Sequence, residues 1–321
     1  MTDMKGERIK GMGVNGVVHV GFSKTGTTTL QKHLFAKHRE IKFAGKPYGD
    51  EEFKDLIHEL IMKESIAYDA SKLKTYIGES GLLDLNDGKK VWVVSDEMFV
   101  SYSKVRDKGM VAHRVRDVFG ECKILITIRN QGDLLRSAYL SRGRYLSDVP
   151  RRFLGLGVSY EDWIALSLMN YERGYINHGD YYKTVVYYSR LFGKENICVL
   201  LLEEFIHDRE KYMEILSGFL GVYKQEALEC VKNAHEHKDM TGEELDYELI
   251  RSVFFPLHNT VLFKGISKAA SKWKHRKDKS SEAQVDLSPE IQERLDEIFR
   301  PGNRELVKEF GLPLEKYGYP L

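Results

Sequence analysis

The fold is decided by the stretch Val17-Val18-His19-Val20-Gly21-Phe22-Ser23-Lys24-Thr25-Gly26-Thr27-Thr28-Thr29-Leu30. A short apolar run meets a glycine-flanked loop that carries one lysine and four threonines, and a segment with helical apolar spacing follows it. This order predicts a strand, a phosphate-binding loop and a helix. Backbone N–H groups of the loop and of the first helical turn would then face an anion, which the helix dipole also favours.

The loop differs from the nucleoside-triphosphate loop at its most informative position. That motif requires Gly, four residues, Gly, Lys and then Ser or Thr. Gly21 and Gly26 have the spacing, but Thr27 occupies the lysine position and Lys24 lies inside the loop. The sequence therefore predicts an anion site of a different kind.

Continuous apolar segments at 91–94, 124–128 and 197–202 alternate with helical patterns, which predicts an α/β fold with a parallel sheet covered on both faces. We expect a single domain over residues 1–321, with a flexible N-terminus at 1–16 and a mobile basic loop at 264–286. The helical patterns lie at 27–35, 50–64, 110–119, 132 onward, 159–168, 181–192, 209–220 and 289 onward, and a last helix is expected after a break at Arg300-Pro301-Gly302-Asn303 and before Gly311.

Composition excludes several classes of protein. The chain has 321 residues, 42% of them hydrophobic, which suffices for a full core. Its 49 Lys and Arg against 48 Asp and Glu give a net charge of +1, which argues against nucleic-acid binding. No apolar run has the length of a membrane span, and we expect a cytoplasmic protein. The three cysteines are expected to be free thiols, without a metal cluster.

A second candidate phosphate site follows the apolar segment 124–128. Arg129 stands at the strand end, where α/β sheets bind ligands, and Ser137 lies eight residues later in the expected helix. Both side chains could reach one phosphate, through a guanidinium and a hydroxyl.

The two segments together resemble sulfotransferases that use 3′-phosphoadenosine 5′-phosphosulfate (PAPS), and the chain is similar to bacterial-type small-molecule or carbohydrate sulfotransferases. Lys24-Thr25-Gly26-Thr27-Thr28-Thr29 resembles their 5′-phosphosulfate loop, and Arg129 with Ser137 resembles their 3′-phosphate motif, although Gln131-Gly132 replaces a common proline. The resemblance implies a P-loop-like sulfotransferase fold and no metal. It implies that the co-substrate is bound by Ser23, Lys24, Thr25, Gly26, Thr27, Thr28, Thr29, Arg129, Ser137, Lys264 and Gly265.

The resemblance also implies catalytic roles. Lys24 would stabilise charge on the leaving phosphate oxygen, and a general base would activate the acceptor hydroxyl. Glu97, after the strand at 91–94, is the first candidate base, with a helix cap as its structural alternative. His178, in a predicted loop, is the second, and His19 is expected to be a core histidine.

The implied reaction is sulfuryl transfer from PAPS to a hydroxyl, in preference to an amine, of a small-molecule, carbohydrate or lipid acceptor. Two alternatives remain. In a kinase or NTPase using ATP, Asp96 would hold Mg²⁺. In a non-catalytic module, the fold would only bind nucleotides or sulfated ligands. Sequence leaves the acceptor and the oligomeric state open.

Overall fold

The computed structural model describes residues 15–46, 51–85, 89–100, 107–143, 157–234 and 285–321. The chain divides into two compact units. The sheet unit comprises residues 1–130, 180–234 and 302–319, and the helical unit comprises residues 131–179, 235–301 and 320–321.

The sheet unit is built on five parallel strands in the order β2-β3-β1-β4-β5. They are β1 (Gly16–His19), β2 (Ile41–Gly45), β3 (Val91–Ser95), β4 (Lys123–Ile128) and β5 (Ile197–Leu201). The predicted parallel sheet is confirmed. β2 was not predicted, because this edge strand is only partly buried and has no continuous apolar run.

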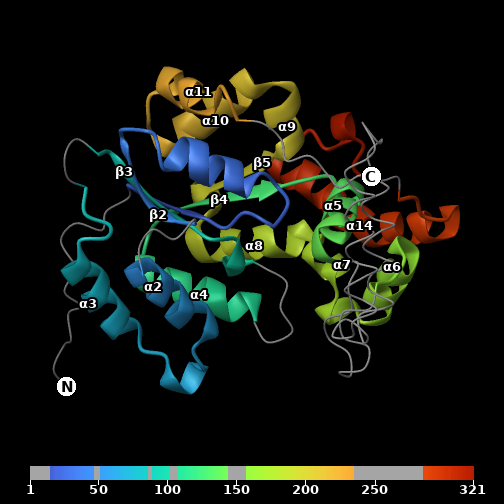
Figure 1. Cartoon of the computed structure of the whole chain (residues 1–321), viewed down its shortest axis with the longest axis horizontal. Helices are drawn as coiled ribbons and strands as arrows, with labels where there is room; N and C mark the ends of the chain where they lie inside the picture. Colours follow the sequence, from blue (N-terminus) through green and yellow to red (C-terminus); the bar gives the residue numbers. More distant parts are fainter. Residues whose placement is uncertain (1–14, 47–50, 86–88, 101–106, 144–156, 235–284) are drawn as a thin grey trace, which may run out of the picture. The chain divides into compact units, whose positions relative to one another are not determined.

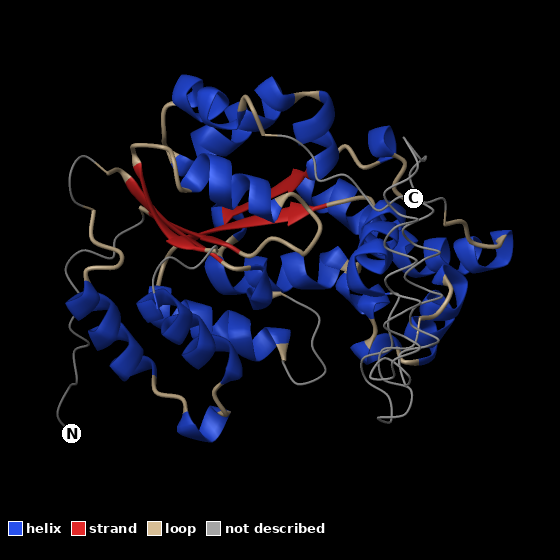
Figure 2. Cartoon of the chain, in the orientation of Figure 1, coloured by secondary structure: helices blue, strands red, loops and turns tan. Residues whose placement is uncertain are grey.

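Helices cover both faces of the sheet (Figure 1, Figure 2). One face carries α1 (Thr27–Thr29), which continues as the π-helix η1 (Leu30–Phe35), together with α9 (Leu202–His207), α10 (Arg209–Leu220) and α11 (Lys224–Val231). The other carries α2 (Glu51–Met62), α4 (Lys108–Phe119) and α8 (Tyr181–Phe192), with α3 (Ala70–Ser80) against α4. The predicted α/β class is therefore confirmed.

The core explains why these segments fold together. On the first face, Leu34 and Phe35 pack with strand residues such as Val93 and Leu125 and with Met213 of α10. On the second, Trp92 of β3 packs on Phe119 of α4, with ring centroids 5.8 Å apart. A Cβ at Gly16 would collide with the Trp92 ring, so glycine is required beside this indole.

The described part of the helical unit contains α5 (Gln131–Ala138), the π-helix η4 (Tyr139–Gly143), α6 (Tyr160–Met169) and α7 (Tyr175–His178). Ser159 caps α6 by accepting a hydrogen bond from the N–H of Asp162 at 3.1 Å, as its position predicts. Its core holds the apolar and aromatic residues Leu135, Tyr139, Tyr160, Ile164, Ile176, Leu295 and Phe299.

The C-terminal region corrects one prediction. The expected break at residues 300–303 is absent, because α14 runs from Pro289 to Phe310 with Pro301 inside it. A proline in a helix interior removes one backbone donor and costs about 3 kcal/mol, and α14 nevertheless continues through Pro301. Among the described residues, no helix has the length and apolar character needed to cross a membrane.

Candidate active site

The carboxyl edge of the sheet has a topological switch point between β1 and β4. The chain leads from β1 to β2 at one side of the sheet and from β4 to β5 at the other. Neighbouring strands with diverging connections leave a crevice at their carboxyl ends, where α/β sheets bind ligands. Residues 20–26 follow β1 and Arg129 follows β4, so the predicted phosphate loop and the predicted strand-end arginine share this edge.

The loop at 20–26 has two residues in the left-handed region of backbone conformation, which glycine adopts readily and other residues rarely do. Gly26 has φ 79° and Lys24 has φ 66°, and Lys24 is the only non-glycine residue with positive φ in the described part of the chain. The Gly26 carbonyl accepts hydrogen bonds from the N–H groups of Thr29 and Leu30, which starts the helix. A strained residue held by its surroundings is typical of functional loops, and here it is the predicted catalytic lysine.

A buried polar network lies beneath this loop. The Thr25 hydroxyl donates to the Phe22 carbonyl and lies 2.8 Å from the Thr127 hydroxyl of β4. Thr127 in turn lies 3.3 Å from His19 Nε2, and His19 Nδ1 lies 2.8 Å from Ser95 Oγ. The network therefore connects the loop to β4, β1 and β3.

The direction of each hydrogen bond follows from the single proton that a hydroxyl can donate. Because the Thr25 hydroxyl donates its proton to the Phe22 carbonyl, Thr127 must donate to Thr25 and accept from His19. His19 then carries its proton on Nε2, so Ser95 donates to Nδ1. Ser95 also accepts from the Gln31 amide at 3.0 Å. The hydroxyls of Thr25, Thr127 and Ser95 thus each donate one hydrogen bond and accept one.

His19 is a core residue, as predicted, with no exposed surface. Burial lowers its pKa from 6.5 to about 3, because the charged form loses its hydration. The imidazole is therefore neutral, as the bond directions require. A Cβ at Gly21 would lie 2.3 Å from Thr127 Oγ1 and 2.6 Å from His19 Nε2. Only glycine lets the loop backbone pass this close to the network.

An acidic pair follows β3 at the same edge. Asp96 is fully buried and accepts a hydrogen bond from the Met98 N–H at 2.8 Å. Glu97, next in the chain, has a side chain that is 26% exposed. Asp96 therefore caps the following turn. The helix-cap role that was the structural alternative for Glu97 belongs to Asp96.

Lys46, which follows β2 directly, lies beside this acidic pair, and sequence reasoning missed it. Gly45 pairs with Ser95 in the β2–β3 ladder, so Lys46 and Asp96 emerge side by side. Lys46 Nζ lies 3.2 Å from Asp96 Oδ1 and 3.8 Å from Glu97 Oε1. An ammonium in contact with Asp96 opposes the role of magnesium ligand that a kinase would give this carboxylate. Recognising β2 would have revealed Lys46 as a strand-end residue.

The backbone at Arg129 is held from three directions within the sheet unit. Tyr181 donates its hydroxyl to the Arg129 carbonyl at 2.7 Å, and the Asn130 N–H donates to Glu203 at 2.7 Å. The Asn130 amide donates to the carbonyls of Tyr317 and Gly318 in the C-terminal segment. Burial raises the pKa of Glu203. Sequence gave no signal for this C-terminal contact.

The sulfotransferase domain model matches residues 15–311. The chain belongs to the sulfotransferase domain family. Among solved structures, the sulfotransferase from Alicyclobacillus acidocaldarius matches with a TM-score of 0.55 and 18% identity, over 95% of this chain and 98% of that chain. No curated protein sequence matches this chain.

Two further structures match with lower scores. Mouse sulfotransferase SULT7A1 complexed with PAP has a TM-score of 0.42 and 16% identity, over 90% of this chain and 84% of that chain. The sulfotransferase domain of the Synechococcus PCC 7002 olefin synthase has a TM-score of 0.42 and 14% identity, over 89% and 94%. The predicted sulfotransferase family and fold are confirmed by the family match.

Two predicted site residues of this sulfotransferase-family chain belong to the helical unit. Ser137 lies in α5 and is buried. His178 ends the short helix α7 and is 1% exposed, with its ring 5.1 Å from that of Tyr175. The predicted loop at His178 is therefore wrong, because His178 is the last residue of α7 and its imidazole is buried beside the Tyr175 ring. Lys264 and Gly265 lie outside the described residues, as does most of 264–286.

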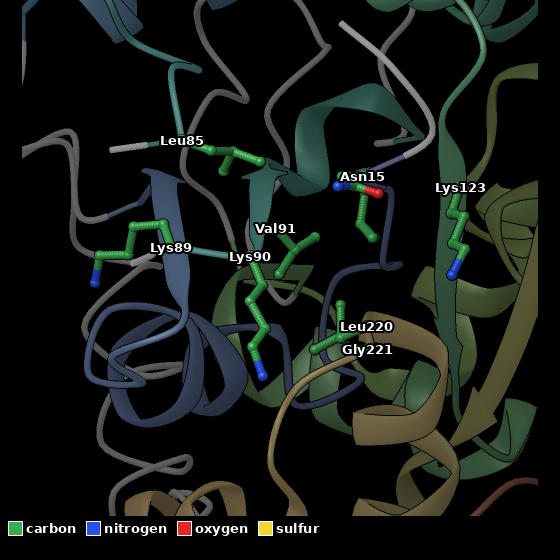
Figure 3. A pocket seen from close by; sticks show the side chains of 9 residues that line it. Asn15, Leu85, Lys89, Lys90, Val91, Lys123, Leu220 and Gly221 are labelled. Atoms are coloured by element: carbon green, nitrogen blue, oxygen red, sulfur yellow. The ribbon is translucent and has the colours of Figure 1, made fainter. Parts of the chain in front are cut away.

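A pocket of about 390 Å³ lies at the opposite, amino edge of the sheet (Figure 3). It is lined by the starts of β3 and β4 and carries three lysines. Each is engaged by the protein: Lys89 with the Arg39 carbonyl, Lys90 with Glu40, and Lys123 with the Phe219 carbonyl. All three lysines of this pocket thus already have an oxygen partner within the protein.

Proposed function

We propose that this sulfotransferase-family chain transfers a sulfuryl group from PAPS to a hydroxyl of a small-molecule, carbohydrate or lipid acceptor. The observation that carries the proposal is the shared edge of β1 and β3. His19 pairs with Ser95 in that ladder, so the lysine-bearing phosphate loop and Glu97 follow adjacent parallel strands. An anion site and a carboxylate on one edge supply both requirements of hydroxyl sulfation.

The loop is proposed to bind the 5′-phosphosulfate group. The loop is held by the hydrogen bonds of the Thr25–Thr127–His19 network. Lys24 and Gly26, with positive φ, turn its backbone between β1 and α1. The proposed ligands are Ser23, Lys24, Gly26, Thr27, Thr28 and Thr29. Because the Thr25 hydroxyl is committed to Phe22 and Thr127, any contribution of Thr25 falls to its backbone N–H. Arg129 and Ser137 are proposed for the 3′-phosphate on the sequence resemblance.

PAPS supplies an activated sulfuryl group on a phosphate leaving group. The acceptor oxygen forms a new S–O bond while the S–O bond to the phosphate breaks, and that electron pair stays on the phosphate oxygen. Lys24 provides the cation that stabilises this developing charge. The products are a sulfate ester and 3′-phosphoadenosine 5′-phosphate (PAP).

The acceptor proton needs a destination in the same step. Glu97 is proposed to take it, since its carboxylate is partly exposed at the edge that carries the loop. His178 stays the second candidate, although its imidazole is almost fully buried. Glu97 later releases the proton to water, so the carboxylate is regenerated.

A thermal-shift comparison tests the donor. PAP without metal should raise the melting temperature, whereas ATP with Mg²⁺ should raise it much less, because only a bound ligand stabilises the folded state. Stabilisation by ATP with Mg²⁺ alone would favour the kinase alternative. Stabilisation by PAP with no turnover of PAPS across a broad acceptor panel would favour the binding module.

A further inference from the structure

We propose that Lys46 is a positioning residue that holds the Glu97 carboxylate in place for proton transfer, with Asp96 as its anchor. The proposal rests on the proposed function, in which Glu97 is the general base. Lys46, Asp96 and Glu97 all belong to the sheet unit and emerge from the adjacent strands β2 and β3.

The ion pair with Asp96 is the shorter and the more deeply buried of the two. Asp96 has no exposed side-chain surface, and Lys46 Nζ lies 3.2 Å from its Oδ1. A buried carboxylate is costly without a counter-charge and hydrogen bonds. Asp96 has both, because it also accepts the Met98 N–H. This arrangement fixes the ammonium and the first turn after β3 together.

The Lys46 ammonium also lies close to Glu97. Lys46 Nζ lies 3.8 Å from Glu97 Oε1, and both side chains are about a quarter exposed, at 27% and 26%. The contact is to Oε1, and about a quarter of the Glu97 side chain stays exposed.

The geometry gives Lys46 and Lys24 different tasks. Lys24 lies within the phosphate loop after β1, whereas Lys46 follows β2, with β3 between the two strands. Lys46 is therefore expected to act on transfer through Glu97, and to leave binding of PAP unchanged. This separation makes the proposal testable.

The test is a double-mutant cycle on transfer, with PAP binding as a parallel readout. Lys46→Met in the wild-type background should lower kcat about ten- to a hundredfold, because displacing a catalytic group by about 1 Å has such effects. The same change in the Glu97→Gln background should lower the residual rate less than about twofold, since the interaction that it removes is already lost. PAP should bind all four proteins equally.

Three further variants separate a positioning role of Lys46 from a loss of stability. Lys46→Arg should restore most of kcat by supplying a cation at the same place. If Lys46→Met unfolds because Asp96 is left unpaired, Lys46→Met with Asp96→Asn removes that buried charge and replaces it in the cycle. Lys63→Met breaks the partly exposed ion pair with Glu59 on α2, 2.9 Å long, and should leave kcat unchanged.

The outcomes are distinct. A full loss of rate from Lys46→Met in the Glu97→Gln background, or a loss of PAP binding, would overturn the proposal, because Lys46 would then act directly on the donor. Unchanged kcat in Lys46→Met would also overturn it. A fully active Glu97→Gln protein would refute the base assignment, and absence of PAPS turnover by the wild type would refute the proposed function.

Discussion

The hydroxyl groups of Thr25 and Thr127 lie 2.8 Å apart and join the loop at 20–26 to the strand beside it. Thr25 belongs to the loop after β1, and Thr127 is fully buried in β4. The contact continues through His19 and Ser95 to β3. One row of side chains thus links the loop to all three central strands.

Thr127→Val should loosen the loop. Valine removes the hydroxyl that serves both Thr25 and His19, and unsatisfied buried polar groups cost about 1–3 kcal/mol. We expect that loss in the free energy of unfolding, measured with denaturant, and weaker binding of PAP. Thr75→Val, on the exposed part of α3, is the matched control. Equal effects of the two substitutions would contradict the role of the network.

Stability should depend on pH through His19. Its pKa is about 3 in the folded chain and 6.5 ordinarily, so the unfolded chain binds the extra proton between these values. Stability therefore falls as the pH drops through this window, by about 1.4 kcal/mol per pH unit. The free energy of unfolding of the wild type, minus that of His19→Gln, should shrink accordingly between about pH 6.5 and pH 4.5. Parallel curves for the two proteins would exclude this linkage.

Lys24→Gly should separate activity from stability. Lys24 has φ 66°, a conformation that glycine adopts without strain. We expect the free energy of unfolding to stay equal or to rise by up to about 1 kcal/mol. The melting temperature should follow it. Turnover should fall by about two to three orders of magnitude, because the cation at the leaving oxygen is lost. Near-normal turnover would remove Lys24 from the catalytic residues.

Arg129→Ala should affect the ligand that carries a 3′-phosphate. We expect PAP to bind about tenfold to a hundredfold more weakly, which corresponds to about 1.4–2.8 kcal/mol. AMP, which lacks the 3′-phosphate, should lose little affinity. Isothermal titration with both nucleotides measures the difference. Arg116→Ala, whose guanidinium packs on Phe192, serves as control. Equal losses for both nucleotides would contradict the 3′-phosphate assignment.

Much of the fold could be predicted because the buried strands are continuous apolar runs. β3, β4 and β5 follow this pattern, and the helices start and end at recognisable residues, such as Ser159 and Gly221. β2 escaped because a half-buried edge strand shows no such run, and Lys46 escaped with it. The continuous α14 was missed because proline suggests a break that helical neighbours can override.

The sequence motifs of the candidate site could be recognised, but the hydrogen bonds that hold its loop and strand end in place could not. Lys24 and Arg129 were predicted as site residues because a loop and a strand end each have a sequence signature. The bonds beneath them were not, since His19, Ser95 and Thr127 are far apart in sequence and meet only in the sheet. The same holds for Glu203 and Tyr319, which share a hydrogen bond beside Arg129. Pairings set by tertiary structure leave no local pattern.

The central claim is sulfuryl transfer from PAPS with Glu97 as base, and its most direct measurement is product formation with PAPS labelled in the sulfuryl group. Wild-type protein, incubated with a panel of hydroxyl acceptors, should form one labelled sulfate ester for each PAP released. Glu97→Gln should bind PAP normally and lower that rate by about two to four orders of magnitude. A Glu97→Gln protein as active as the wild type, or wild-type protein that releases no PAP with any acceptor, would contradict the account.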